Sequence, residues 1–113
     1  MITELKIEDI AEGTGKAAVR GALITAQYRG FLLDGTEFDS SYRHGEAFRT
    51  VLSNGRVIQG WILGLIGMKT GGKRKLWVPA AMAYGERQVG TMIPANSDLI
   101  FEIELLEVLT RDD

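Results

Sequence analysis

Hydrophobic and polar residues alternate along most of the chain, which is the period of a β-strand that buries one face. Ile24, Ala26 and Tyr28 share one face of such a strand, which is predicted to end at Gly30. Three later runs keep the same period and centre on Phe48 and Leu52, on Leu76 and Val78, and on Phe101, Ile103 and Leu105. Turn residues separate the runs at short intervals, so the sequence predicts a β-rich, antiparallel architecture.

A hairpin is predicted around Asp34-Gly35, because this dipeptide favours a tight turn between two strands. The hairpin places Phe38 at the end of the returning strand. The polar segment that follows, Ser40 to Glu46, keeps neither the strand period nor the helix period, and we expect an irregular loop there.

Only the segment V-I-Q-G-W-I-L-G-L-I-G-M, Val57 to Met68, changes to the helical period. Its large apolar residues recur at spacings of three and four on one helix face, and they are Ile58, Trp61, Ile62 and Leu65. Ser53 and Asn54 precede the segment and can cap its first turn. One short helix laid against an antiparallel sheet is an α+β fold.

Glycines mark the packing and the end of the predicted helix. Gly60 and Gly64 lie four residues apart and form a flat stripe, which is useful where another backbone comes close. Gly67, or the pair Gly71-Gly72, is expected to end the helix and to turn the chain into the next strand.

The length of 113 residues predicts one domain, spanning 1–113, with loose ends at 1–6 and 110–113. A hydrophobic content of 45%, a charged content of 25% and a net charge of -2 are typical of soluble globular proteins and disfavour nucleic acid as a partner. The N-terminus interrupts its apolar residues with charges, so we expect no secretory signal, no membrane span and a cytoplasmic location. No large apolar stripe remains after the core is assigned, so a monomer is expected.

Several chemistries lack the residues that they need. The chain has no cysteine and one histidine, His44, which disfavours disulfides, thiol catalysis, cysteine-bound metals and a Ser-His-Asp triad. The acidic residues are scattered, and Glu102 and Glu104 are interpreted as the solvated face of a strand. We therefore expect neither a metal nor a cofactor.

The segment G-M-K-T-G-G-K-R, Gly67 to Arg74, imitates a phosphate-binding loop. It matches seven positions of G-x-x-x-x-G-K-[ST], but Arg74 stands where a hydroxyl would hold magnesium, and a helix precedes the segment where a strand should. Its K-R-K run is interpreted as the solvent face of the strand that carries Leu76 and Val78.

Aromatic residues occur at the ends of the predicted strands and on the predicted helix, at Tyr28, Phe38, Phe48, Trp61, Tyr84 and Phe101. A conventional aromatic core is one explanation. The surrounding motifs favour another; they are Y-R-G-F-L-L-D-G-T-E-F-D-S-S, V-I-Q-G-W, G-M-K-T-G-G-K-R-K-L-W-V-P, A-Y-G-E-R and I-P-A-N-S-D-L-I-F-E-I-E-L-L-E-V. Together, in this order from about Ile7 to Val108, they closely resemble the FKBP family of peptidyl-prolyl cis/trans isomerases.

The resemblance implies a twisted five-stranded antiparallel sheet wrapped around one short helix. Matched motif by motif, it places a pocket at Tyr28, Phe38, Asp39, Phe48, Val57, Ile58, Trp61, Tyr84, Ile93 and Phe101. The family's tryptophan forms the pocket floor, and the Ile58 N–H and the Tyr84 hydroxyl would donate to bound carbonyls. Asp39 would be the acidic group at the rim, although an aspartate in D-S-S also commonly bonds the N–H groups of its own turn.

The implied activity is isomerisation of Xaa-Pro bonds in peptides and in unfolded or folding proteins, with no covalent step and no cofactor. Macrolides that occupy the family's pocket are implied ligands. The same pocket could instead serve a chaperone or adaptor that only holds proline-containing segments, and the pocket residues do not separate these two functions.

The chain also departs from the family pattern. Ala47 and Ala95 stand where prolines are common, and they are expected to loosen loops at the rim. His44 stands where the family often has a basic residue, with Arg43 beside it, so the partner of the rim aspartate is left open. Ile62 replaces a common acidic residue and, if exposed, is either a lone apolar residue or part of a contact patch.

Overall fold

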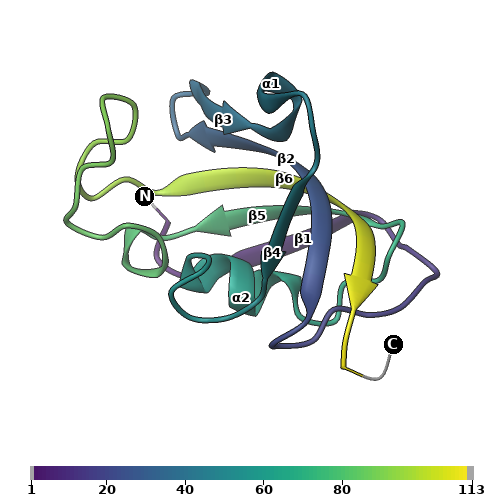
Figure 1. Ribbon diagram of the computed structural model, residues 1–113. Coiled ribbons are helices and arrows are strands. Elements are labelled where there is room, and N and C mark those ends of the chain that lie inside the picture. The colour runs from purple at the N-terminus through teal and green to yellow at the C-terminus, as the bar shows by residue number, and fades with distance from the viewer. Residues whose placement is uncertain (1, 112–113) are drawn as a thin grey trace.

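The computed structural model describes residues 2–111, which form an antiparallel sheet with a helix against one face (Figure 1). The strands are β1 (Lys6–Ala11), β2 (Leu23–Leu32), β3 (Glu37–Ser40), β4 (Phe48–Val51), β5 (Lys73–Val78) and β6 (Leu99–Leu109). The helices are α1 (Ser41–His44), α2 (Gln59–Leu65) and the short 3-10 helix η1 (Ala80–Met82). An antiparallel sheet with one main helix, α2, confirms the predicted α+β fold.

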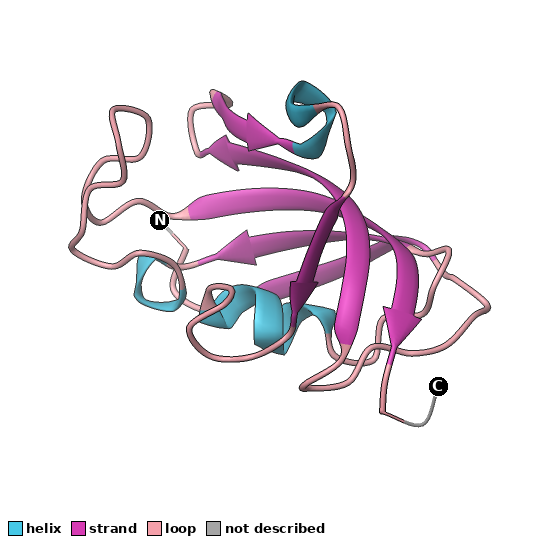
Figure 2. Cartoon of the chain, in the orientation of Figure 1, coloured by secondary structure: helices cyan, strands magenta, loops and turns pink. Residues whose placement is uncertain are grey.

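The sheet runs in the order β1-β5-β6-β2-β3, and β4 also pairs with β2. β3 pairs with residues 29–31 of β2 and β4 with residues 23–26, while β6 pairs with the other side of β2 along its whole length. Helix α1 lies between β3 and β4 in the chain (Figure 2). Six strands therefore fill five positions, because β3 and β4 share one of them.

The first strand is not visible in the alternation, because all six residues of β1 are exposed. β1 pairs with β5, and the Ile2 N–H donates to Asp98 Oδ2 at 2.9 Å. Ile2 is thus tied to the connection before β6 and Lys6 belongs to β1, whereas residues 2–5 lie outside any strand, and the loose end expected at 1–6 stays a prediction. At the other end, Lys16 Nζ donates to Thr110 Oγ1 at 2.7 Å, and residues 1 and 112–113 lie outside the described range.

The hairpin around Gly35 is confirmed, but the strand before it is longer than predicted. β2 continues past Gly30 to Leu32, where the Leu32 N–H donates to the Thr36 carbonyl at 2.8 Å. Gly35 has a φ of 91°, which is the left-handed conformation that such a turn requires. Phe38 is the second residue of β3, so it lies inside the returning strand and not at its end.

The expected loop over residues 40–46 contains helix α1. The Ser40 side chain accepts the Arg43 N–H at 3.1 Å, and Gly45, with a φ of 77°, ends the helix. These are an ordinary N-cap and an ordinary C-terminal glycine. A single turn is too short to show a helical period, so the prediction of an irregular loop was wrong.

Helix α2 lies where the period predicts it, but its cap is different. The residue before its first turn is Ile58, whose side chain makes no capping hydrogen bond. Ser53 lies further upstream, where its carbonyl accepts the Arg56 N–H at 3.2 Å, so Ser53 and Asn54 belong to a preceding turn and do not cap the helix. Gly67, with a φ of 86°, follows the helix end as expected.

The glycine stripe of α2 faces β5, as a close contact requires, but side chains and not a backbone fill it. A Cβ on Gly60 would lie 2.5 Å from Val78 Cγ1, and a Cβ on Gly64 would lie 2.8 Å from Leu76 Cδ1. The two glycines therefore let the helix settle onto the side chains of the sheet. Ile62 is only 1% exposed, so it belongs to the interior and not to a contact patch.

The core lies between α2 and the sheet. Phe101, Ile103 and Leu105 are buried on one face of β6, as the alternation predicts. An irregularity in the pairing between Thr25 and Ala26 shifts the phase, so that Val108 is also buried.

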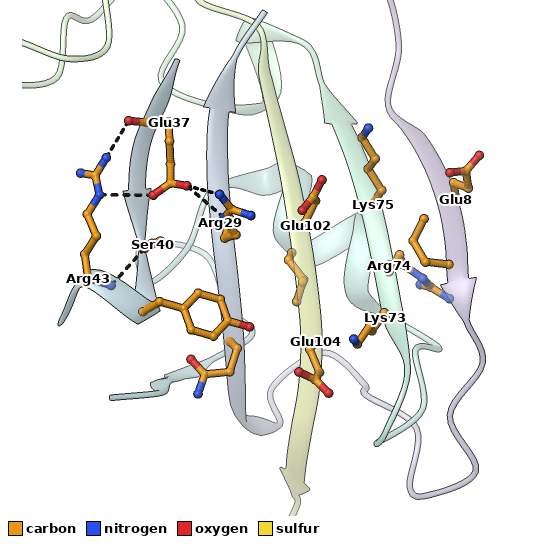
Figure 3. Close-up of a pocket in the computed structure, with 14 residues that line it drawn as sticks. Glu8, Arg29, Glu37, Ser40, Arg43, Lys73, Arg74, Lys75, Glu102 and Glu104 are labelled. Atoms are coloured by element: carbon orange, nitrogen blue, oxygen red, sulfur yellow. Dashed lines mark hydrogen bonds and ion pairs between the residues drawn. The ribbon is translucent and has the colours of Figure 1, made fainter. Parts of the chain in front are cut away.

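The opposite face of the sheet carries charges (Figure 3). Lys73 pairs with Glu104 and Lys75 with Glu102 in the register of β5 and β6, which agrees with their interpretation as a solvated face. Arg74 does not belong to it: its Nη1 donates to the Gly64 carbonyl at 2.9 Å, and its side chain is only 12% exposed. The K-R-K run is therefore divided between the two faces of the sheet, because neighbouring strand residues point in opposite directions.

Candidate active site

Five aromatic rings form one continuous cluster around Trp61, which lies in the first turn of α2. Its ring packs edge-to-face against those of Tyr28, Phe48 and Phe101, with centroid distances of 5.5, 5.9 and 5.6 Å. Phe38 packs against Phe101 at 5.8 Å, and Tyr28 against Phe48 at 5.6 Å. These are the favoured geometries of aromatic pairs. The ring of Trp61 is thus the centre of a wall contributed by β2, β3, β4 and β6.

Exposure within the cluster is uneven. Trp61 is 4% exposed and Phe101 is equally buried, whereas Phe48 is 36% exposed and Tyr28 and Phe38 are half-buried. Trp61 therefore lies beneath the other rings with little of its surface uncovered. A ligand would meet the rings of the cluster mainly at Phe48, Tyr28 and Phe38.

Asp39 of β3 lies beside the ring cluster, and its carboxylate accepts hydrogen bonds from three donors. Its Oδ2 accepts the Tyr28 hydroxyl at 2.6 Å, and its Oδ1 accepts the Ser40 N–H at 2.9 Å and lies 2.8 Å from His44 Nε2. Asp39 thus bonds the N–H of its own turn and also contacts an aromatic residue of the cluster. Arg43 is turned away and pairs with Glu37, so His44 is the partner that the sequence left open.

These contacts set the charge of the site. Burial opposes ionisation of Asp39, but the hydrogen bonds from Tyr28, His44 and the Ser40 N–H outweigh it and hold the pKa of this carboxyl below its ordinary value. Burial, together with the hydrogen bond to Asp39, raises the pKa of Tyr28. Burial and the nearby Asp39 charge also raise the pKa of Tyr84. At neutral pH the site therefore holds one carboxylate and two neutral phenols.

Tyr84 and Ile93 come from the long connection between β5 and β6. The Gly85 N–H donates to the Ala80 carbonyl at 2.8 Å and the Asn96 N–H to the Gly85 carbonyl at 2.7 Å, which folds the connection back on itself. Ile93 is buried in the core cluster, and Tyr84 packs against it. The connection thereby brings a second tyrosine close enough to Asp39 for the charge of that carboxylate to raise the pKa of Tyr84.

Two hydrogen-bond donors at the site are not used within residues 2–111. The Ile58 N–H and the Tyr84 hydroxyl have no acceptor in this part of the chain. Ile58 precedes the first helical turn, where N–H groups lack helical partners. Both donors are available to a bound molecule.

Six of the ten predicted pocket residues are joined by direct contacts, the five rings and Asp39, and the other four belong to or pack against the hydrophobic core that contains Trp61 and Phe101. These four are Val57, Ile58 and Tyr84, which pack against that core, and Ile93, which is part of it. No group of three acidic or histidine side chains within residues 2–111 could hold a metal ion. In the same range, no helix has the length and apolar character needed to cross a membrane.

Sequence reasoning missed two residues that shape the site. Gly30 faces the edge of the Phe38 ring, where a Cβ would lie 2.5 Å from Cζ, so the ring needs a glycine here. Ser41 Oγ accepts the Tyr28 N–H at 2.9 Å and lies 2.5 Å from Gln27 Oε1, which ties α1 to β2. The D-S-S motif contains the signal for Ser41, whereas nothing in the sequence shows which ring faces Gly30.

Comparisons with known proteins agree on one family. A family model described as FKBP-type peptidyl-prolyl cis-trans isomerase matches residues 14–106. A curated FK506-binding protein of Neisseria meningitidis serogroup A is 52% identical over 104 residues, which covers 92% of this chain and 95% of the relative. Peptidyl-prolyl cis-trans isomerase FPR2 of Saccharomyces cerevisiae is 48% identical over 92 residues, covering 80% of this chain and 68% of the relative.

Solved structures give the same result. The crystal structure of AtFKBP13 superimposes with a TM-score of 0.85 at 40% identity, covering 93% of each chain. FkpA from Escherichia coli also gives a TM-score of 0.85, at 43% identity over 92% of this chain. The chain spans only 47% of the FkpA structure, so about half of that protein has no counterpart in the matched region.

Proposed function

This chain belongs to the FKBP-type peptidyl-prolyl cis-trans isomerase family, and we propose that the ring cluster around Trp61 is where it accelerates rotation about Xaa-Pro bonds. The chain is thus an isomerase by family. The proposal adds the location of the activity and the roles of the ten residues.

The reaction needs no covalent catalyst. An Xaa-Pro bond isomerises in tens to hundreds of seconds, because the twisted state loses amide resonance over a barrier of about 18–20 kcal/mol. Bringing this time to milliseconds requires about 5–7 kcal/mol of selective stabilisation, at about 1.36 kcal/mol per tenfold. A dry aromatic wall favours the twisted amide, which has less charge separation than the planar one, and fixed donors can hold the flanking carbonyls.

The observation that carries the proposal is the pair of unused donors beside the rings. The Ile58 N–H and the Tyr84 hydroxyl have no internal acceptor within residues 2–111, and both residues pack against the core that contains Trp61 and Phe101. They are suited to two carbonyls of a bound proline-containing segment. In this proposal Tyr28, Phe38, Phe48 and Phe101 form the walls, Trp61 the floor, Val57 and Ile93 the apolar margin, and Asp39 the charged rim.

Substrates, ligands and context follow as further parts of the proposal. The substrates are proline-containing peptides and unfolded or folding proteins. Macrolides of the FK506 type are proposed to compete for the same site, because the relatives are FK506-binding proteins. We also propose that the protein is cytoplasmic, on the grounds of its composition and its lack of cysteine.

A binding module without catalytic purpose is the second candidate, and the match to a family of isomerases does not favour it. The two functions differ in what a pocket substitution removes. For an isomerase, Trp61→Ala lowers the exchange of a short Xaa-Pro peptide far more than it lowers the binding of an unfolded client, after correction for stability. Equal losses would favour the module.

The decisive assay measures cis/trans exchange of a short Xaa-Pro peptide with and without an FK506-type macrolide. We expect acceleration that the macrolide abolishes. Tyr84→Phe removes one donor only, and should lower kcat/KM about fivefold to tenfold, the value of one hydrogen bond of about 1–1.4 kcal/mol, while leaving the fold intact. Exchange no faster than in solution would refute the proposed site, and an unchanged Tyr84→Phe enzyme would remove Tyr84 from it.

A further inference from the structure

The rim aspartate of this chain is paired with a side chain that can change its charge. His44 Nε2 lies 2.8 Å from Asp39 Oδ1, and the His44 side chain is 61% exposed. The neighbouring cation, Arg43, donates to the Glu37 carbonyl at 2.8 Å and pairs with the Glu37 carboxylate, so it does not replace His44. Histidine is the side-chain type that ordinarily changes charge between pH 5 and 8.

A cavity adjoins this pair and the proposed pocket. It has a volume of about 390 Å³ and lies between α1 and the start of β4. Its lining residues are Tyr28, Ser41, His44, Glu46, Ala47, Phe48 and Arg49. Tyr28 and Phe48 also belong to the ring cluster, so the cavity and the pocket share a wall. A side chain that flanks a proline bound at the rings can reach this cavity.

The charges around His44 give the cavity a preference. Glu46 and Arg49 line the cavity with opposite charges, and Asp39 does not line it but lies 2.8 Å from His44 Nε2. These three groups together leave one net negative charge when His44 is neutral. Protonation of His44 cancels that charge. Tyr28 does not contribute, because its burial and its hydrogen bond to Asp39 raise its pKa and keep it neutral.

We propose that this cavity is a subsite for a basic side chain of the substrate, next to the Xaa-Pro bond, and that His44 weakens the preference when it becomes protonated. The inference rests on the proposed function, because it assumes that substrate lies against the ring cluster. His44 acts on specificity through its charge and takes no part in bond rotation.

The size of the effect follows from one unit charge. At a separation of about 7 Å in a water-like dielectric, adding one positive charge changes the affinity for a second one by about threefold. The expected quantity is therefore a ratio: kcat/KM for a peptide with lysine beside the Xaa-Pro unit, divided by that for the same peptide with glutamine. The ratio removes pH effects that both peptides share.

The experiment measures this ratio at pH 8.0 and pH 5.5, with the lysine placed in turn on each side of the Xaa-Pro unit. In the unaltered protein we expect the ratio of lysine peptide to glutamine peptide to fall about threefold on acidification, for at least one of the two positions of the lysine. His44→Gln should keep the higher ratio at both pH values and His44→Arg the lower one. Arg43→Gln is the matched control, since it removes a cation one residue away that faces Glu37, and its ratio should still change with pH.

A second measurement does not depend on variants. Coupling between two binding events is reciprocal, so a bound lysine should also disfavour the proton on His44. An NMR titration of the His44 ring should therefore show a lower midpoint with the lysine peptide bound than with the glutamine peptide bound. The expected difference is about half a pH unit, which corresponds to the threefold change in affinity. His44 is the one histidine of the chain, so its signal is unambiguous.

The outcomes separate this inference from the proposed function. If no peptide exchanges faster than in solution, the proposed function fails. If the peptides are isomerised but the ratio has the same pH dependence with histidine, glutamine and arginine at position 44, or the two peptides give the same His44 midpoint, the subsite is refuted and the isomerase remains.

Discussion

Replacing Gly30 by alanine tests how the sheet positions one wall of the site. Gly30 pairs with Asp39 across β2 and β3, and its Cα faces the ring of Phe38. An added Cβ would lie 2.5 Å from Phe38 Cζ and 3.0 Å from each Cε, whereas ordinary contacts of a Cβ begin at 3.4 Å. The ring must therefore move by about 1 Å, an overlap of the kind that makes added methyl groups costly in packed regions.

The magnitude combines two opposing terms. Overpacking costs about 1–3 kcal/mol, and alanine gains about 0.5–1 kcal/mol over glycine inside a strand, so the free energy of unfolding should fall by up to about 2.5 kcal/mol. Phe38 packs against Phe101, so its displacement also moves the wall of the proposed pocket. A misplacement of about 1 Å can cost up to about 100-fold in rate, and we expect kcat/KM to fall about tenfold.

Urea unfolding and Xaa-Pro exchange measure the two effects. The matched control is Phe38→Leu, alone and combined with Gly30→Ala, because leucine has no ring edge at the point of overlap. In the Phe38→Leu background, Gly30→Ala should leave the free energy of unfolding nearly unchanged or raise it. An equal cost in both backgrounds would refute the steric argument, and unchanged exchange by the Gly30→Ala protein would show that Phe38 is not part of the working pocket.

Three further predictions concern stability and are checked by urea unfolding. Gly60→Ala should lower the free energy of unfolding by about 1–3 kcal/mol, because the added Cβ meets the Val78 side chain. In a Val78→Ala background the same substitution should raise the free energy of unfolding, since only the helix preference for alanine remains. A decrease in both backgrounds would contradict this explanation. Arg74→Met should lower the free energy of unfolding by about 1–2 kcal/mol, because it leaves the Gly64 carbonyl without its donor. The decrease should be smaller in an Asp9→Asn background, where the ion pair with Asp9 is already absent. An unchanged free energy of unfolding would show that these contacts are not stabilising. The folded pKa of Asp39 is lowered, so its contribution is present above the unfolded pKa of about 3.9 and is lost as the pH falls through the folded value. The difference between the unaltered protein and Asp39→Asn should therefore narrow from pH 5 to pH 2, and a constant difference would contradict the shift.

The parts of the fold that were predictable are those governed by burial. β6 and α2 bury one face each, and burial imposes the period of two or of three to four that the sequence shows. β1 has no buried face, so its pairing with β5 leaves no period to detect. The one-turn helix α1 is likewise invisible to a period, because its Ser40 cap and its terminal glycine are local signals only.

The candidate site likewise has features that the sequence predicts and features that it does not. The motifs bring five aromatic residues and Asp39 into contact, because five of these residues have fixed places in strands of the sheet and Trp61 in the helix. The partner of Asp39 was not predictable, since His44 and Arg43 are neighbours on one helical turn and point in different directions. The helical period already indicates that Trp61 lies on the buried face of α2, but not which residues cover it, because the three rings from β2, β4 and β6 meet only in the folded chain.

The division of one sheet position between β3 and β4 has a consequence for contact with unfolded chains. An exposed strand margin is a template to which a foreign extended segment can add through its backbone, and that is how sheets aggregate. On one side this protein offers only two stretches of four residues, interrupted by α1. On the other side β1 carries Lys6, Glu8 and Asp9 and has an irregularity between Asp9 and Ala11. Both margins are therefore poor templates for strand addition, so an extended segment that binds this protein would have to be recognised through side-chain contacts.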